Sequence, residues 1–199
     1  TSCLVFVLLT GLSPYRGIYR IFTFITRRRH DAVMMASSVM VSLLVFIGLI
    51  STLVHVCSGV GEFTLAFALA SMLSAATAST LMWNFPQDPM DSCGTMSNKG
   101  LVWVMIMCGA ATFGLLHYIV ALSILGVGIV MRLIFGYCIA KNQGTAQRPY
   151  VSALQLLTLF AILLDLILLK SQNYEFLNLE TLTWLEHHAE RLTGLAYSA

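Results

Sequence analysis

Long runs of apolar residues dominate the chain, and short polar stretches separate them. The longest run covers residues 100–141, and no Asp, Glu, Lys or Arg interrupts it between Lys99 and Arg132. A helix needs about 20 apolar residues to cross a bilayer, whereas one continuous helix over this run would be about 60 Å long. We therefore expect a long helix here that tilts strongly, breaks near Gly126–Gly128 or turns back.

A second apolar region, residues 32–84, predicts a helical hairpin that crosses the membrane twice. The two arms meet at Ser58–Gly61, where glycine supplies the unusual backbone angles of a tight turn. One face of the second arm carries small residues at four-residue spacing, which lets helix backbones approach closely. We interpret this face as a packing seam, and its residues are Ala66, Ala70, Ser74 and Ala78.

Three further segments complete the predicted layout. Residues 150–192 predict a second long helix, which is apolar in its first part and amphipathic in its last part. Residues 1–12 are apolar but too short to span a bilayer. Residues 14–30 combine five arginines with aromatic and aliphatic side chains, so they predict a basic helix lying in the membrane interface. The positive-inside tendency places these arginines on the cytoplasmic or matrix side.

Composition supports an integral membrane protein. The 199 residues are 58% hydrophobic and 10% charged, whereas soluble domains carry about 25% charged residues. The length fits a single membrane domain, residues 1–199, with an all-α, polytopic fold. The net charge of +2 gives no support for nucleic-acid binding.

Candidate ligands for metals and cofactors are sparse. The five cysteines show no CxxC spacing, so they predict neither a zinc site nor a disulfide framework. Asp88 and Asp91 lie in the polar loop 85–99 but lack the repeated oxygen positions of a calcium loop, which favours a solvated loop. His55 and His117 invite a bis-histidine haem hypothesis that no other residue supports. The sequence predicts no metal, no cofactor and no catalytic group.

Arg132 is the sharpest chemical feature of the chain. Arginine stays protonated in proteins, and a charge inside the membrane is costly and needs a reason. One interpretation is a fixed positive charge that gates an ion path beside a carboxylate. The alternative is an arginine near a helix end whose side chain reaches the interface, since Lys141 is about 13 Å away by helical rise.

Three other polar residues are candidates for a proton path with Arg132. Asp165 lies in the apolar run before Lys170, so it either pairs with that lysine, reaches water, or acts as a partner of Arg132 or a proton-carrying acid. His117 lies in the middle of the run 100–141. Gln155, like Asp165, belongs to the next apolar run, and all three side chains are expected to line access paths.

The layout resembles subunit a of the rotary ATP synthases, mitochondrial type. That family has an interfacial helix, a transmembrane hairpin and two long tilted helices that wrap the rotor ring, and the first long helix carries an essential arginine. The run GIVMRLIFG around Arg132 is similar to the arginine-centred run of that family. Two positions depart from it, because Gly136 stands where the family has asparagine and Lys141 where it has an acid or histidine.

The resemblance implies a stator that carries proton translocation in the mitochondrial inner membrane, with Arg132 releasing protons from a carboxylate of a rotor c-ring. The residues alone leave two other functions open. One is a structural or accessory membrane subunit of a respiratory-type complex, with no chemistry of its own. The other is a small channel or transporter, which the lack of repeated halves disfavours. All three place the chain in the lipid bilayer, and the first two place it beside other membrane subunits.

Overall fold

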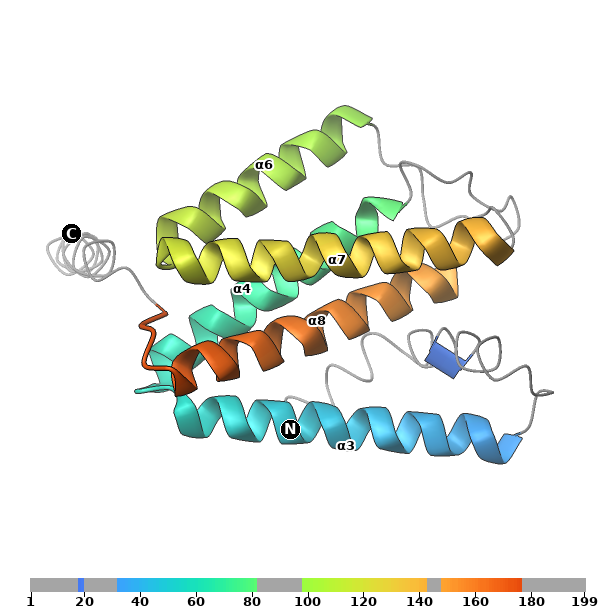
Figure 1. Cartoon of the computed structure of the whole chain (residues 1–199), viewed down its shortest axis with the longest axis horizontal. Coiled ribbons are helices and arrows are strands. Elements are labelled where there is room, and N and C mark those ends of the chain that lie inside the picture. The colour runs from blue at the N-terminus through green and yellow to red at the C-terminus, as the bar shows by residue number, and fades with distance from the viewer. Residues whose placement is uncertain (1–17, 20–31, 82–97, 143–147, 177–199) are drawn as a thin grey trace, which may run out of the picture.

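The computed structural model describes residues 18–19, 32–81, 98–142 and 148–176. Within these ranges the chain is all-helical, which confirms the predicted class (Figure 1). The helices are α3 (Ala32–Val56), α4 (Val60–Ser79), α6 (Asn98–Leu115), α7 (Tyr118–Asn142) and α8 (Arg148–Ser171).

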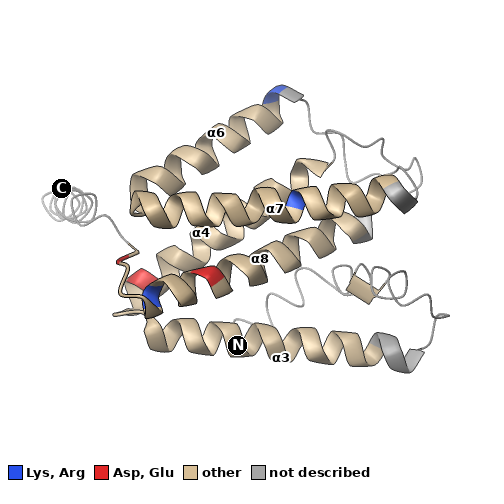
Figure 2. Cartoon of the chain, viewed as in Figure 1, with Lys and Arg blue, Asp and Glu red and all other residues tan. Residues whose placement is uncertain are grey.

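Four of these helices are long and apolar enough to cross a membrane. Charged side chains are rare along them, and several gather at the end of the bundle where α8 finishes (Figure 2). Helix α6 is apolar but shorter, and such a set of helices fits an integral membrane protein in contact with lipid. The four spans are Ala36–Val56, Val60–Ser79, Tyr118–Ala140 and Tyr150–Ser171.

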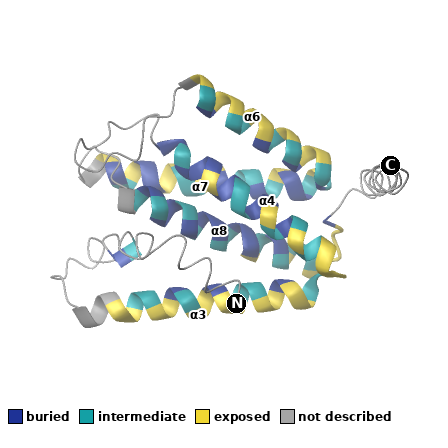
Figure 3. Ribbon diagram, turned by 180° about the vertical axis from the view of Figure 1, so that it is seen from behind, coloured by how far each residue is buried: buried dark blue, intermediate teal, exposed yellow. Residues whose placement is uncertain are grey.

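The core lies around α4 and α8, which run antiparallel and carry most of the buried residues (Figure 3). Helix α7 packs on α8 and α4, and α6 lies outermost, mainly against α4. On the other side α3 covers α8, where the rings of Phe46 and Phe160 stack with centroids 5.6 Å apart. The small residues of the predicted seam lie inside this core and are at most 2% exposed; they are Ala66, Ala70, Ser74 and Ala78.

Residues 100–141 do not form one long helix. Helix α6 ends at Leu115 and α7 begins at Tyr118, so the chain turns back between them, whereas α7 continues unbroken through Gly126–Gly128. A tertiary hydrogen bond stabilises the turn between α6 and α7. In it the backbone N–H of His117 donates to the carbonyl of Phe176 at 3.0 Å. That bond satisfies a donor that an unbroken helix would have bonded within itself.

Helix α8 ends at Ser171, so the helix predicted over residues 150–192 is shorter than expected. Asn173 has φ 65°, a left-handed conformation that asparagine tolerates better than most residues. The N–H groups of Asn173 and Tyr174 donate to carbonyls in the last turn of α8, at 3.0 and 3.1 Å. This pattern is a Schellman motif, and the reversal it makes carries Phe176 back onto the bundle.

Several predictions concern residues outside the described ranges and stay predictions. They are the apolar segment 1–12, the interfacial helix 14–30 apart from the helical Ile18 and Tyr19, most of the loop 85–99, and residues 177–192 of the second predicted long helix.

Candidate functional site

The candidate site is built around Arg132, the one charged residue of the span Tyr118–Ala140. Its side chain is half-buried, and its Nε donates to the Oγ1 of Thr80 on α4 at 3.1 Å. Among the described residues, no carboxylate forms an ion pair with this guanidinium. The contact that holds the cation is therefore a neutral hydroxyl, and we call Arg132, Thr80, Thr77 and Gly128 the arginine site.

The last turn of α4 presents hydroxyls because residues 77–80 read Thr-Ala-Ser-Thr. The hydroxyl of Thr80 donates to the carbonyl of Thr77 at 2.7 Å, and that of Ser79 donates to the carbonyl of Ala76 at 2.7 Å. Thr80 is the C-cap residue of α4, so it lies where the unpaired carbonyls of a helix carry a partial negative charge that favours a cation. Arg132 thus reaches the end of α4 that suits its charge.

Close approach of α4 and α7 brings these groups together. A Cβ atom on Gly128 would lie 3.0 Å from the Oγ1 of Thr77, which is tighter than ordinary van der Waals contact. Both helices run in the same direction here, so Gly128 and Arg132 on α7 meet Thr77 and Thr80 on α4 as two successive contacts. The glycine lets the two backbones approach, and the arginine lies one turn further along.

The outward side of α7 at the level of Arg132 is apolar and uncovered in this chain. More than half of each neighbouring aliphatic side chain is exposed, so a lipid or a partner helix has to cover this surface in a membrane. The residues are Ile129, Val130, Leu133 and Ile134, with exposed fractions of 61, 54, 59 and 51%.

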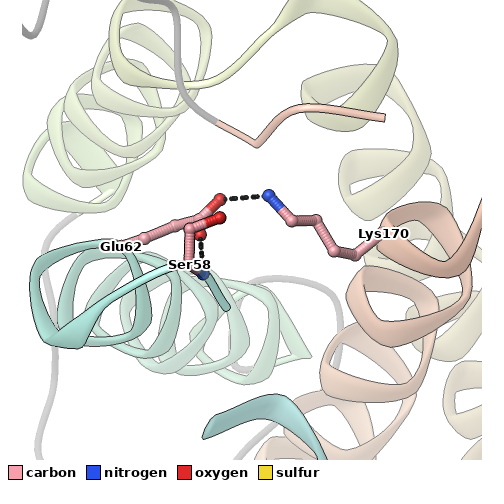
Figure 4. Close-up of polar contacts among 3 residues, drawn as sticks. All are labelled: Ser58, Glu62 and Lys170. Carbon is pink, nitrogen blue, oxygen red and sulfur yellow. Dashed lines mark hydrogen bonds and ion pairs between the residues drawn. The ribbon is translucent and has the colours of Figure 1, made fainter. Parts of the chain in front are cut away.

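A second polar cluster, the Glu62 end, lies where α4 begins and α8 finishes. Lys170 Nζ pairs with Glu62 Oε1 at 2.7 Å, and the backbone N–H of Ser58 donates to Glu62 Oε2 at 2.6 Å (Figure 4). Glu62 is in the first turn of α4, where the helix dipole favours an acid. Only 17% of the Lys170 side chain and 12% of the Glu62 side chain are exposed, so both charges are neutralised within the chain.

Phe176 closes the Glu62 end. Its side chain is fully buried, and the Nζ of Lys170 lies 5.1 Å from the centre of its ring, within cation–π range. Cys57, in the turn before α4, lies half-buried next to this cluster. Burial first, and then the negative charge of Glu62, raise the pKa of the Cys57 thiol to about 11, and Lys170 opposes the shift.

The structure distributes the other predicted path residues along the bundle instead of gathering them at Arg132. Asp165 and Gln155 are both half-buried on α8, and His117 lies at the turn between α6 and α7, its ring 4.7 Å from that of Tyr118. Lys170 pairs with Glu62 and not with Asp165. The Oδ2 atom of Asp165 is buried and has no hydrogen-bond partner within the part of the chain that the structure describes.

No family model, curated protein or solved structure matches this chain. Within the described residues, no group of three or more His, Cys, Asp and Glu side chains could hold a metal ion.

Sequence reasoning missed the partners of both cations. Thr80 is 52 residues from Arg132, and the available signal was the run of hydroxyl residues that ends α4, which stands out in an otherwise apolar span. Glu62 is 108 residues from Lys170. The signal there was an acid directly after a glycine turn, which is typical of a helix N-terminus.

Proposed function

We propose that this chain is a membrane-embedded subunit of a multi-subunit energy-transducing complex in the mitochondrial inner membrane. In this proposal it is a stator similar to subunit a of the rotary ATP synthases. Helices α3 and α4 cross the membrane as a hairpin, α7 and α8 are tilted spans, and Arg132 acts on protons bound to a rotor ring. The observation that carries the proposal is a membrane-length span, Tyr118–Ala140, whose one cation has no carboxylate partner among the described residues.

The energetics favour a role for Arg132 outside its own chain. An arginine at the centre of a spanning helix costs about 2.5–3.5 kcal/mol on insertion scales. A hydrogen bond to a charged group returns about 1.5–3 kcal/mol, so the bond to Thr80 offsets the cost at best. Leucine at this position would fit the neighbouring aliphatic surface at no such cost. Arg132 thus brings no net stabilisation to its own chain, and this favours a functional role for its charge.

The surroundings of Arg132 suit a protein partner that carries an acid. The exposed Ile129 and Leu133 lie on the face of α7 next to that of Arg132, so a partner helix packed against them would bring its own side chains near this residue. A fixed positive charge lowers the pKa of a carboxyl that comes within about 4–6 Å. A protonated carboxyl arriving at Arg132 would therefore release its proton, and Arg132 itself would stay charged throughout.

Access paths for the protons form the remaining part of the proposal. Asp165 is the best candidate for a path residue, because its buried Oδ2 has no hydrogen-bond partner among the described residues and such atoms are commonly satisfied by ordered water. His117 and Gln155 would line the same paths. A proton would reach the partner carboxylate through water held by these side chains, and it would leave on the other side of Arg132.

The test has two parts, applied to the complex purified from its native membrane. First, the complex should contain a ring of short helical hairpins beside this chain. Second, Arg132→Lys should assemble normally but lose more than about nine-tenths of proton transport, because lysine keeps the charge but not the planar fork of donors. Lys99→Gln, at the exposed start of α6, is the control and should leave transport unchanged.

A second candidate is an accessory subunit with no chemistry of its own. It is favoured by the broad apolar surfaces of α3 and α6, which carry large exposed side chains such as Leu44 and Trp103 and suit packing against lipid or other subunits. In that case Arg132→Lys should be silent in both assembly and transport. Wild-type transport in this variant, or a complex that lacks a ring, would reject the stator proposal.

A further inference from the structure

The hydrogen bond between Thr80 and Arg132 fixes one edge of the guanidinium. The group has five N–H donors arranged in a rigid plane, and the Nε–H lies on a different edge from the pair of terminal nitrogens, Nη1 and Nη2. Holding Nε–H against a fixed oxygen therefore sets both the plane of the group and the direction of its terminal edge. With Nε–H engaged by Thr80, that terminal edge is the one left free to pair with a carboxylate through two hydrogen bonds.

The Thr80 oxygen is well suited to hold that donor. Its own hydrogen is committed to the carbonyl of Thr77 at 2.7 Å, so a lone pair is left for Arg132 at 3.1 Å. Thr80 is 9% exposed, and its backbone N–H is bonded to the carbonyls of Ala76 and Thr77 at 3.3 and 3.2 Å. The acceptor is thus buried, oriented by its own helix and placed at the negative end of that helix.

From this geometry we propose that Thr80 is a positioning residue for Arg132, which directs the Nη1–Nη2 edge toward a carboxylate of a partner subunit. The inference rests on the proposed function. It adds that the end of α4, a helix distant in sequence from the arginine, sets where the cation acts. Gly128 contributes to the same arrangement, because its lack of a side chain lets α7 approach Thr77 closely enough for Arg132 to reach Thr80.

The first test observes the bond directly and does not depend on transport. In the full chain, labelled with 15N and held in lipid nanodiscs, the Nε–H signal of Arg132 is assigned by its loss in Arg132→Lys. Hydrogen exchange of this Nε–H should accelerate about tenfold or more in Thr80→Val, since the bond to a charged donor is removed. It should stay slow in Thr80→Ser, which keeps the acceptor.

The second test asks whether the bond matters for transport in the purified complex. Thr80→Val should lower proton transport about tenfold, and Thr80→Ser should restore it. Thr112→Val is the matched control, because Thr112 is also fully buried and its hydroxyl also donates to a carbonyl of its own helix, Cys108 at 2.6 Å. Among the described residues its hydroxyl is bonded to a backbone carbonyl and to no charged side chain, and its loss should leave transport unchanged.

A third variant guards against misfolding of Thr80→Val. Gly128→Ala keeps every hydrogen-bonding group but brings a methyl group to 3.0 Å from Thr77 Oγ1, so it should accelerate the Nε–H exchange by separating the helices. Gly126→Ala, which meets no atom within 4 Å, is its control.

The outcomes separate the two proposals. Unchanged Nε–H exchange in Thr80→Val would overturn the positioning role whatever the function. Loss of transport in Arg132→Lys with wild-type transport in Thr80→Val would overturn the positioning role and leave the stator proposal standing. Silent Arg132→Lys would reject the stator proposal and with it the positioning role.

Discussion

The Glu62 end and the arginine site each hold a cation among apolar helices, but they neutralise it in different ways. At the Glu62 end, Lys170 has a carboxylate at 2.7 Å and an aromatic ring at 5.1 Å. At the arginine site, Arg132 has a hydroxyl at 3.1 Å and, among the described residues, no carboxylate partner. The first arrangement is complete within one chain. The second has no such acid among the described residues, and this difference is the reason why the proposed function is placed at Arg132.

The difference also follows from where the two groups lie along α4. Glu62 occupies the first turn, where a helix favours negative charge, and Thr80 caps the last turn, where it favours positive charge. Lys170 pairs with the acid in the first turn, Glu62, whereas Arg132 donates to the C-cap residue itself, Thr80. One central helix, α4, therefore contacts both cations. Variants at the Glu62 end should mainly change stability, and variants at the arginine site should mainly change transport.

The largest expected effect on stability is at the Glu62 end. Phe176→Ala should lower the free energy of unfolding by about 3 kcal/mol, because the fully buried ring fills the core and lies under Lys170. The measurement is chemical unfolding of the chain in detergent micelles. Tyr174→Ala, at 37% exposure in the same turn, should change stability by about 0.5 kcal/mol or less. Equal losses would mean that Phe176 does not close the core.

The ion pair itself comes next. Removing one partner of a buried pair costs about 3–5 kcal/mol; since Lys170 and Glu62 retain 17% and 12% exposure, we expect about 2 kcal/mol for Glu62→Gln or Lys170→Met. The double variant should lose less than the sum of the two single losses, because no unpaired charge remains. Lys99→Met is the exposed control. Strictly additive losses would show that the pair contributes nothing to stability.

These two regions also show how far the sequence could predict the molecule. The apolar runs predicted α3 almost to the residue, because a charge-free segment bounded by a glycine turn leaves little choice. Turning back within residues 100–141 was one of the expected alternatives, but its position at His117 was not predictable, since the N–H of His117 is bonded by Phe176, a residue far along the chain. Gly126–Gly128, where one of the three alternatives placed a break, lies within α7, and Gly128 faces Thr77 there. Gly128 in this apolar helix is therefore a site of close helix packing and not of a bend.

The candidate site was predictable only in part, for a similar reason. Arg132 stood out because charge in an apolar run is rare. Its partner Thr80 did not, since threonine is common and the contact spans 52 residues. The end of α8 was missed because Asn173 makes a turn that glycine usually makes. The sequence pattern allowed either a continuous helix or a turn at these positions, and hydrogen bonds outside the regular helices stabilise the turn.

Loss of the charge of Arg132 should change the free energy of unfolding by less than the variants at the Glu62 end do, and in the opposite direction. Arg132→Leu should raise the free energy of unfolding by about 1 kcal/mol, since leucine matches its aliphatic neighbours and Thr80 keeps its bond to Thr77. The same unfolding measurement in micelles applies, with Lys170→Met as the contrasting variant. A loss as large as that of Lys170→Met would show that Arg132 is a structural anchor.

The smallest effect is electrostatic and concerns Cys57. Burial and the charge of Glu62 raise the pKa of this thiol to about 11. The thiolate is the reactive form, so maleimide labelling of Cys57 should be slow at pH 8 and should rise with pH up to a midpoint near that pKa. Removing the negative charge in Glu62→Gln removes one of the causes that raise the pKa, so the midpoint should move to lower pH.

Labelling rates followed by mass spectrometry between neutral and strongly alkaline pH would measure this shift, with Cys57→Ser to assign the modified peptide. A variant that merely loosens the turn would speed labelling at every pH and leave the midpoint in place. A wild-type midpoint near the ordinary value of 9.0 would contradict the buried placement of Cys57 beside Glu62. Because no such thiol lies beside Arg132 in the described structure, this titration reports on the Glu62 end alone and shows whether its charges are as self-contained as the geometry indicates.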